Sequence, residues 1–559
     1  MRKIPVKYIF VFGGVLSGLG KGIVASSLGF LLKSRGLKIT IHKLDPYLNV
    51  DPGTMNPYQH GEVFVLDDGS ETDLDLGHYE RFIDESLSRI NTTSSGRVYW
   101  DVLERERRGD YLGETIQVIP HITDEIKNRI KAVNESDEYD IIITEVGGTV
   151  GDIEGQPFYE AIRQFILEVG KDNSIVIHTT LLPFINAAGE MKTKPTQHSV
   201  MRLREIGLEP NVLVCRTEAE HHLTDKLKQK LGLFCNVETS YVFESPDVET
   251  IYEIPLVLNQ QKFDEIIIQK LGIKTSGHKE SLNILENHIG RFKHPKYNVT
   301  IAMCGKYNSL HDAYKSILEA FIHAGIENDA RIKIKWIDTE KLESTCNEND
   351  LFQHVDGILI PGGFGDRGIE GKILASKYAR ENRLPFFGIC LGLQCAIIDF
   401  ARNVCGLKNA NSREFNSKCK YPVIDLMSGQ KDIKSKGATM RLGAYICKLK
   451  SSTKAYQAYD QEHIHERHRH RFEVNNKYRA QLEKNGLIVS GENPELNLVE
   501  MIEVEDHPWF IGVQFHPELK SRIVRAHPLF RDFIAAAIEN QEAKNINTGN
   551  NSTSSVVHR

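Results

Sequence analysis

Short runs of consecutive apolar residues recur along the chain, and they are separated by stretches with an apolar residue at every third or fourth position. A continuous apolar run is typical of a strand in a parallel sheet, because helices cover both faces of such a sheet and neither face meets water. Runs of this kind lie at residues 8–12, 39–41, 141–144, 175–177 and 212–214. Between two of them, residues 160–168 place Ile162, Phe165 and Ile166 at helical spacing. This alternation predicts an α/β domain built on a doubly wound parallel sheet.

A second set of strands and helices begins near residue 298. Residues 299–304, 357–360 and 510–513 are apolar runs, and residues 312–323 carry an apolar helical face. The two sets are separated by residues 274–297, which are polar and contain one helical pattern at 280–288. After residue 541 apolar residues almost disappear, which is typical of a disordered tail. We therefore predict a first domain over 1–273, a linker over 274–297, a second α/β domain over 298–540 and a tail over 541–559.

The composition is that of a soluble globular protein, with 40% hydrophobic and 26% charged residues. At 559 residues the chain is too long for one ordinary core, which agrees with two or more domains. The formal net charge of -6 gives no reason to expect a nucleic acid as partner, and no apolar stretch approaches a membrane span. The first residues lack a signal-peptide pattern, and the nine scattered cysteines form no Cys-x-x-Cys pair. We expect a cytoplasmic protein with reduced cysteines.

Cys390 is the strongest candidate for a reactive side chain. It follows an apolar run and stands between Gly388 and Gly392, which predicts a strand that turns sharply into a helix and presents the thiol at the turn. Far downstream, His516 and Glu518 can supply a general base and the carboxylate that orients it. A lone cysteine is more often a buried structural residue. The three residues in this order favour a cysteine nucleophile, as in a protease, a hydrolase or a glutaminase.

A glycine-rich loop follows the first strand and precedes a helix. Its glycines and its lysine are Gly13, Gly14, Gly18, Gly20, Lys21 and Gly22. The backbone amides of such a loop bind phosphate, and the lysine adds a positive charge. The usual phosphate loop has a glycine where this chain has Val15 and a Ser or Thr where it has Gly22, so the hydroxyl that normally binds magnesium is missing. A glycine-rich turn without a ligand is the alternative interpretation.

Other carboxylates must hold the metal ion if ATP and Mg²⁺ bind at this loop. Asp73, Asp75 and Glu145 are the candidates, and Glu145 lies at the end of an apolar strand, at the edge where open α/β sheets bind ligands. A carboxylate at that place could equally cap a helix. Residues 192–197 combine two lysines and two hydroxyls in a Pro-containing loop, which suits a second polyanion such as a nucleoside triphosphate. On its own, that segment is more typical of a solvated basic loop.

Long, collinear motifs carry a resemblance to one family. The N-terminal half resembles the synthase domain of the CTP synthases at residues 13–22, 43–47, 49–55, 59–65, 71–81, 145–154 and 192–200. The C-terminal half resembles the class I glutamine amidotransferase domain of the same family at residues 361–365, 388–394, 466–471 and 515–518. The resemblance spans residues 8–536. It implies a P-loop-like, dethiobiotin-synthetase-like first domain and a second α/β domain of the class I amidotransferase type.

The resemblance also implies a reaction. ATP phosphorylates O4 of UTP, and ammonia released from glutamine travels through a tunnel and displaces that phosphate to give CTP. Phosphate is a far better leaving group than a carbonyl oxygen, and a sheltered route keeps ammonia unprotonated. The implied cofactor is Mg²⁺, with GTP as allosteric activator and CTP as feedback inhibitor. The implied assembly is a homotetramer formed through the synthase domain, which in this family can polymerise into filaments.

Residue roles follow from the same resemblance. Cys390, His516 and Glu518 would form the glutaminase triad, with the Gly363 and Leu391 amides as oxyanion hole. The implied glutamine-binding residues are Gly363, Leu391, Gly392, Leu393, Gln394, Glu414 and Arg471. Those for ATP are Gly18, Leu19, Gly20, Lys21, Gly22, Ile23, Lys43, Tyr58, Asp75, Pro246, Asp247 and Val248. Those for UTP or CTP are Ser17, Asp152, Ile153, Glu154, Lys192, Thr193, Lys194, Pro195, Thr196, Gln197 and Lys230. Asp75 and Glu145 would bind Mg²⁺, His60 would gate the tunnel, and the loop around Arg367 would take part in GTP activation.

The chain departs from the family pattern in three places. Gly18 replaces a common Ser, Pro246 replaces a common Lys, and residues 217–228 form a longer segment, so that Lys230 is placed by its sequence context. Two other functions stay open at this point: a glutaminase that feeds another acceptor, and a filament-forming structural protein whose catalysis is incidental.

Overall fold

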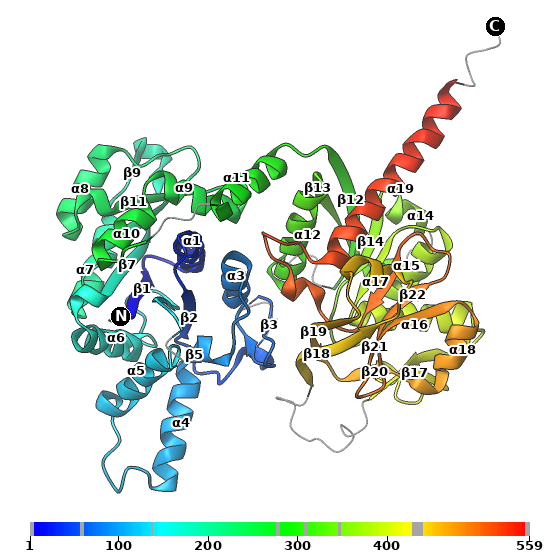
Figure 1. The fold of residues 1–559 in the computed structure, drawn as a ribbon, viewed down its shortest axis with the longest axis horizontal. Helices are drawn as coiled ribbons and strands as arrows, with labels where there is room; N and C mark the ends of the chain where they lie inside the picture. The colour runs from blue at the N-terminus through cyan, green and yellow to red at the C-terminus, as the bar shows by residue number, and fades with distance from the viewer. Residues whose placement is uncertain are drawn as a thin grey trace. The chain divides into compact units, whose positions relative to one another are not determined.

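The computed structural model of the protein describes residues 5–55, 61–135, 138–275, 280–306, 311–344, 348–426 and 440–553. Within them the chain forms two compact units, each with a central β-sheet between layers of helices (Figure 1). The first unit comprises the described residues up to Pro52 together with Asp75–Ile289. The second comprises the described residues of Gly53–Leu74 and those from Gly290 onward. A short segment of the N-terminal half therefore folds with the C-terminal half, which differs from the domain boundaries predicted from the sequence.

The first unit is built on a seven-stranded sheet in which every neighbouring pair is parallel. In order across the sheet, its strands are β11 (Val242–Pro246), β10 (Val212–Thr217), β7 (Ser174–Leu181), β1 (Lys7–Gly13), β6 (Ile141–Val146), β2 (Ile39–Asp45) and β5 (Thr92–Ser94). β1 lies between β6 and β7, so the glycine-rich loop leaves the sheet near its middle. The doubly wound parallel sheet predicted from the apolar runs is confirmed.

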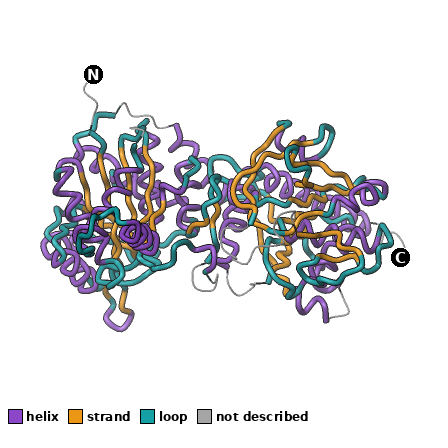
Figure 2. The backbone as a smooth tube through the Cα atoms, turned by 90° about the horizontal axis from the view of Figure 1, so that it is seen from below, coloured by secondary structure: helices purple, strands orange, loops and turns teal. Residues whose placement is uncertain are grey.

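Helices cover both faces of this sheet (Figure 2). One face carries α4 (Ser95–Arg108), α5 (Thr123–Ala132), α6 (Gln156–Val169) and α7 (Lys194–Glu205). A further helix, α8 (Asp225–Cys235), packs against α7. The other carries α1 (Lys21–Ser34), α3 (Leu74–Ile83), α9 (Ile254–Gln260) and α10 (Phe263–Leu271). Phe10 and Phe12 of β1 belong to the core beneath the first group, and the alternate residues Ile9 and Val11 are buried on the opposite side.

The second unit is built on a nine-stranded mixed sheet. In order, its strands are β13 (Ala330–Asp338), β12 (Tyr297–Gly305), β14 (Gly357–Ile360), β15 (Phe386–Ile389), β23 (Phe510–Val513), β22 (Leu498–Val504), β21 (Leu487–Asn493), β18 (Arg441–Leu449) and β19 (His463–His470). Pairing is parallel from β13 to β23 and antiparallel from β23 to β19. A small sheet of β16 (Ala410–Ser412), β17 (Tyr421–Leu426) and β20 (Phe472–Val474) accompanies it.

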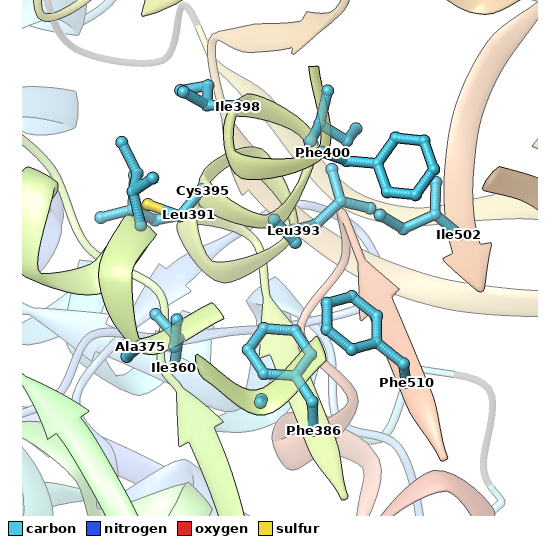
Figure 3. Packing of buried hydrophobic residues seen from close by; sticks show 14 of the residues in the cluster. Ile360, Ala375, Phe386, Leu391, Leu393, Cys395, Ile398, Phe400, Ile502 and Phe510 are labelled. Carbon is cyan, nitrogen blue, oxygen red and sulfur yellow. The ribbon is translucent and has the colours of Figure 1, made fainter. Parts of the chain in front are cut away.

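Two hydrophobic cores fill the faces of this mixed sheet. One lies beneath α13 (Thr339–Ser344), α14 (Glu348–Phe352), α15 (Ile369–Glu381), α16 (Leu391–Asn403) and α18 (Arg479–Lys484). The other lies beneath α12 (Lys315–Glu327), α17 (Lys454–Tyr459) and α19 (Pro528–Thr553). Figure 3 shows how Leu391 and Leu393 of α16 lie among this first core, where the Phe386 and Phe510 rings stack at 4.2 Å between centroids. The start of α16 is thereby fixed against the sheet.

The segment from Gly53 to Leu74 contributes a short hairpin to the second unit, β3 (Phe64–Val65) with β4 (Glu71–Thr72). Its carboxylates pair with arginines of β19: Asp67 accepts from Arg467 at 2.6 Å and Glu71 accepts from Arg469 at 2.8 Å. The backbone N–H of Ala444 also donates to the Asp67 carbonyl at 2.9 Å. Ion pairs and main-chain bonds together explain why this segment folds with the C-terminal half.

The ends of the second unit also differ from the predicted boundaries. The helix predicted at 280–288 within the linker is present as α11 (Glu280–Lys293), with Leu285 and Ile289 buried. The predicted tail begins inside α19, which continues to Thr553. Gln541 donates to the Asn298 carbonyl at 2.7 Å, so a polar contact holds the helix at the predicted start of the tail, where apolar residues become rare. None of the helices in the described part of the chain is long and apolar enough to cross a membrane.

Candidate active sites

Cys390 occupies a strained turn between β15 and α16. Its backbone has φ 50° and ψ −97°, a combination that a residue with a side chain seldom adopts outside functional sites. A Cβ on Gly388 would lie 2.7 Å from the Gly392 carbonyl carbon, and one on Gly392 would lie 2.3 Å from the Ile360 oxygen. Only glycine fits at both places, because strand and helix approach so closely. The pattern predicted from the sequence therefore forms the sharp strand-to-helix turn, in which Cys390 is 3% exposed.

His516 and Glu518 lie beside this turn. The imidazole Nδ1–H donates to Glu518 Oε1 at 2.7 Å, and a Cβ on the neighbouring Gly362 would contact both His516 and Cys390. Burial opposes the charged imidazole, but the Glu518 carboxylate and the adjacent Cys390 outweigh it and raise the pKa of His516 to about 10. His516 Nε2 is buried and makes no hydrogen bond to any residue that the structure describes. The imidazolium thus faces the thiol with an unused donor.

Two cavities open at Cys390. One of about 420 Å³ is lined by Gln394, Glu414, Arg471 and Phe472, together with Gly363 and Cys390. The Glu414 carboxyl accepts from the Gly365 N–H at 3.1 Å, and burial raises its pKa even though Arg471 acts in the opposite direction. A cation and a carboxyl at one end and a thiol at the other match an amino acid with a side-chain amide.

Gly363 lines this cavity, and Leu391 lies next to Gly363. Gly363 follows β14, Leu391 is the first residue of α16, and a Cβ on Gly363 would lie 3.5 Å from Leu391 Cδ2. The N–H groups in the first turn of a helix have no acceptor within the helix, so that of Leu391 points to a partner outside it. Gly392 and Leu393 complete the same turn and are buried.

The second cavity, of about 280 Å³, lies on the His516 side of the thiol. It is lined by His516, Glu518 and Gly362 and by residues of the Gly53–Leu74 segment, among them Met55, Glu62 and Val63. Glu62 is fixed there because its carboxylate accepts from both the N–H and the hydroxyl of Ser316, at 2.9 and 2.6 Å. His60 and Tyr58, which the sequence predicted for the tunnel and for ATP, lie outside the described residues.

In the first unit, the glycine-rich loop turns through left-handed backbone at Gly18 and Gly20, and α1 begins at Lys21. The Lys21 Nζ donates to the Gly148 carbonyl at 2.8 Å, and burial lowers its pKa although the Glu145 carboxylate opposes this. A Cβ on Gly13 would lie 2.5 Å from Lys21 Cδ, so the lysine folds back over the loop. Leu19 is buried and Ile23 half-buried beneath the same turn.

Lys43 of β2 connects the two predicted metal ligands. Its Nζ donates to Glu145 Oε2 at 3.0 Å and to Asp75 Oδ2, and the Tyr79 hydroxyl donates to the same Glu145 oxygen. Burial would raise the pKa of Asp75, but the Lys43 ammonium holds it below its usual value. Burial also raises the pKa of the nearby Asp45 carboxyl to about 6. Asp73 lies outside this cluster; its carboxylate accepts from the Leu74 N–H at 2.6 Å.

Gly22 explains the missing hydroxyl of the phosphate loop. A Cβ at this position would lie 3.1 Å from Asp75 Oδ1 and 3.5 Å from Glu145 Oε2. The two carboxylates therefore occupy the space that a Ser or Thr side chain takes in other phosphate loops. Mg²⁺ fits here, because it prefers oxygen ligands and in nucleotide sites takes one or two carboxylates, with phosphates and waters completing its shell.

The other predicted nucleotide residues surround the same edge of the sheet. Asp247 pairs with Arg216 at 2.9 Å, and Arg216 donates to the Gly18 carbonyl at 2.7 Å, which brings residues 246–248 to the glycine-rich loop. Thr193, Thr196 and Gln197 are buried at the start of α7, whereas Lys194 is exposed and Pro195 half-buried.

The remaining positively charged and acidic positions divide into two groups. Lys192 hydrogen-bonds Glu190 and, together with Lys230, lowers the pKa of that carboxyl, so the two lysines lie near each other. Ser17 and residues 152–154 are exposed, with Ile153 at 84%. In the part of the chain that the structure describes, no hydrogen bond or ion pair joins residues 152–154 to residues 192–197.

Known proteins match the chain over nearly its full length. A family described as CTP synthase N-terminus matches residues 7–273, and one described as glutamine amidotransferase class-I matches residues 309–536. A CTP synthase of Clostridium kluyveri is 57% identical over 535 residues, which cover 96% of this chain and 99% of that protein. One of Caldanaerobacter subterraneus is 56% identical over 533 residues, which cover 95% and 98%. The chain belongs to the CTP synthase family.

Membership of the CTP synthase family confirms the fold class and the enzyme class predicted from the sequence. The protein is a glutamine-hydrolysing ligase that makes CTP from UTP, uses ATP and serves pyrimidine nucleotide synthesis. The glutaminase that feeds another acceptor is thereby excluded as its principal function, because the matched N-terminal half is that of a CTP synthase.

Three side-chain contacts at the candidate sites were not predicted from the sequence. The Gln514 side chain donates a hydrogen bond to Cys390, and the Tyr79 hydroxyl donates to Glu145. Arg469 of β19 donates to Glu71 of the β3–β4 hairpin. Tyr79 lies one helical turn after Asp75, on the same face of α3, and this spacing could have indicated it. Gln514 directly precedes the Phe515-His516 motif, but nothing in its sequence context indicates that it faces the thiol.

Replacing Glu518 by glutamine is expected to lower the pKa of His516 well below its present value of about 10. The imidazolium then loses its carboxylate, while burial still opposes the charge. Because the pKa in the folded protein is raised above the ordinary 6.5, the stabilisation is fully present below pH 6.5 and is lost as pH rises through 10. Glu518→Gln should therefore destabilise the protein more at pH 6 than at pH 11. Histidine NMR, with His516→Gln to assign the resonance, measures the shift, and equal titration in both proteins would contradict it.

Proposed function

We propose that the protein divides its reaction between two sites, with glutamine hydrolysis at Cys390 and phosphoryl transfer at the glycine-rich loop. The observation that carries this proposal is the position of Cys390 at two cavities, one lined by His516 and Glu518 and the other by Glu414 and Arg471. The Lys43–Asp75–Glu145 cluster beside Gly22 supports the second site.

At the first site, Arg471 binds the glutamine α-carboxylate and Glu414 binds its ammonium group. The Cys390 thiolate attacks the amide carbon, and the Gly363 and Leu391 amides stabilise the oxyanion. The His516 imidazolium gives its Nε2 proton to the nitrogen as the C–N bond breaks, so that ammonia leaves and a thioester remains. His516 then takes a proton from water, the hydroxide attacks the thioester, and breaking the C–S bond releases glutamate.

At the second site, the amides of residues 18–23 bind the ATP phosphates, and Lys21 and Lys43 neutralise the charge that develops during transfer to UTP O4. Asp75 and Glu145 would hold Mg²⁺, which would supply further charge neutralisation at the phosphates. The ammonium of Lys43 lies between these two carboxylates, which would hold the metal ion, and it adds its own positive charge at the same place. Residues 246–248 line the adenine, with Tyr58 as a further contact from the sequence prediction.

The UTP triphosphate binds to Ser17, residues 192–197 and Lys230, and Asp152, Ile153 and Glu154 contact the product CTP as feedback inhibitor. No hydrogen bond or ion pair joins residues 152–154 to residues 192–197 in the described part of one chain. The proposed assembly is a homotetramer formed through the synthase domain. GTP activates through the loop of Arg367, whose guanidinium pairs with Glu340 at 2.7 Å. A cytoplasmic location belongs to the same proposal.

An assay with UTP, ATP, Mg²⁺ and glutamine tests the overall scheme. We expect CTP, glutamate, ADP and phosphate in equal amounts, with no CTP when any substrate is omitted. Glutamate formed without CTP would favour a glutaminase with another acceptor. Neither product, from protein that is folded and assembled, would favour the filament-forming structural role.

A further inference from the structure

Gln514 contacts the nucleophile of the glutaminase site. It follows β23 directly, its side chain is fully buried, and its Nε2 donates to Cys390 Sγ at 3.6 Å, within the range of hydrogen bonds to sulfur. None of the described residues that the sequence predicted for this site makes a side-chain hydrogen bond to the thiol, and the His516 Nε2 beside it has no hydrogen-bond partner among the described residues. Gln514 is therefore a second polar group at the reacting atom.

Its orientation is determined by a chain of hydrogen bonds. The Phe472 carbonyl can only accept, so Gln394 must present its Nε2 to it, at 3.2 Å. The same Nε2 lies 3.4 Å from Gln514, which must therefore present its Oε1. The opposite group of the Gln514 amide, the NH₂, then faces the sulfur. A carbonyl oxygen facing a thiolate would repel it. The order of donors and acceptors therefore decides whether the Gln514 amide stabilises or destabilises the Cys390 thiolate.

The backbone around Gln514 is anchored at each residue that matters. Gln514 N–H donates to the Glu500 carbonyl at 2.8 Å, and the Cys390 N–H donates to Val513 at 2.7 Å. Two residues further on, the His516 N–H donates to the Arg467 carbonyl at 2.7 Å. One short segment thus fixes the nucleophile's backbone, the amide donor and the general base relative to one another, as preorganised catalysis requires.

We propose that the Gln514 amide holds and stabilises the Cys390 thiolate, and that Gln394 acts on catalysis through Gln514 as well as through glutamine. This inference rests on the proposed role of Cys390 as nucleophile. A hydrogen bond to a thiolate is stronger than one to a thioester sulfur, because the acceptor is charged. The donor therefore stabilises the thiolate before attack and again as it leaves the second tetrahedral intermediate. It also leaves the His516 Nε2 proton for the departing ammonia.

Gln514→Met tests the donor, because methionine keeps the length and apolar volume of the side chain and removes the N–H. Alkylation of Cys390 by iodoacetamide, followed by mass spectrometry across pH, reports the thiolate without any turnover. We expect the pH midpoint to rise by about one unit and kcat/KM for glutamine hydrolysis to fall about tenfold, the size of one hydrogen bond to a charged group. Gln514→Glu, which places a carboxylate at the thiolate, should shift both quantities further in the same direction.

Gln457→Met is the matched control, since it makes the same change at an exposed glutamine of α17 in the same unit. It should leave the pH midpoint and the hydrolysis rate at their wild-type values. CTP synthesis from free ammonia should be unchanged in all three variants, which shows that they are folded. An unaltered alkylation profile in Gln514→Met would overturn the inference. Glutamine hydrolysis that survives in Cys390→Ala would instead overturn the proposed function, so the two failures are distinguishable.

Discussion

Cys390→Ala is expected to abolish CTP synthesis from glutamine and to leave synthesis from free ammonia intact. Without the thiol no thioester forms, and the loss of a triad nucleophile lowers kcat for hydrolysis by on the order of 10⁴-fold or more. The phosphate loop and its carboxylates lie in the other compact unit of the chain, so phosphoryl transfer to UTP should continue. Rates of CTP formation with each nitrogen source, measured at saturating UTP and ATP, give the ratio directly.

Cys395→Ala is the control for this experiment. Cys395 lies in the same helix α16 and is fully buried in its core, and burial raises the pKa of its thiol to about 12, so it is chemically inert. The same change there should lower stability and leave both nitrogen sources usable. If ammonia failed to restore synthesis in Cys390→Ala while the protein remained folded, the division of the reaction between two sites would be wrong.

Local pattern was enough to predict the elements that position the chemistry. The first sheet is parallel and covered on both faces, so β1, β2, β6, β7 and β10 each contain a continuous apolar run. The edge strands β5 and β11 are partly polar and were not predicted. The turn at Cys390 could be predicted because Gly388 and Gly392 are both required by close approach of strand and helix. Asp75 and Glu145 could also be proposed from the sequence. The phosphate loop has Gly22 where a Ser or Thr usually binds the metal ion, so other oxygen ligands were needed.

Features that depend on contacts between distant parts of the chain could not be predicted in this way. Membership of the Gly53–Leu74 segment in the second unit depends on pairs such as Arg469 with Glu71, whose partners are 398 residues apart. The antiparallel half of the second sheet was not foreseen either, because its strands are partly polar and one of them, β19, is made largely of His and Arg. Gln514 could not be predicted because its orientation depends on hydrogen bonds that involve Gln394 and Phe472, which lie near it only in the folded protein.

The same limit applies to the ends of the domains. Composition predicted a tail after residue 541, yet α19 continues because Lys544 donates to the Val355 carbonyl at 2.9 Å and Gln541 reaches Asp356 at 3.1 Å. Backbone acceptors at the end of a sheet offer such partners to a polar helix, and a count of apolar residues does not include them.

Replacing Lys43 by methionine is the second change with a large expected effect, and Lys38→Met is its control. Lys38 is exposed directly before β2 and is expected to lose neither stability nor activity on substitution. It matches Lys43 in residue type and in its attachment to the same strand, but it lies outside the cluster of carboxylates. Differences between the two variants therefore report the ion pairs of Lys43 and not a general effect of removing a lysine.

Lys43→Met is expected to destroy CTP synthesis with glutamine and with ammonia alike, by on the order of 10² to 10³-fold, because a charge that stabilises the transferring phosphoryl group is lost. Glutamine hydrolysis should persist, which is the reverse of Cys390→Ala.

Lys43→Met should also destabilise the protein. The buried Glu145 and its neighbour Asp75 then lack their cation, and breaking such a pair from one side costs about 3–5 kcal/mol in the free energy of unfolding. Burial now raises the pKa of Asp75 above that of the unfolded chain, so the loss is greatest at neutral pH and shrinks as falling pH protonates this carboxyl. Mg²⁺ alone should raise the melting temperature of Lys43→Met more than that of the wild type, since the metal ion replaces the missing charge. An equal effect of Mg²⁺ on both proteins would show that Asp75 and Glu145 do not form the metal site.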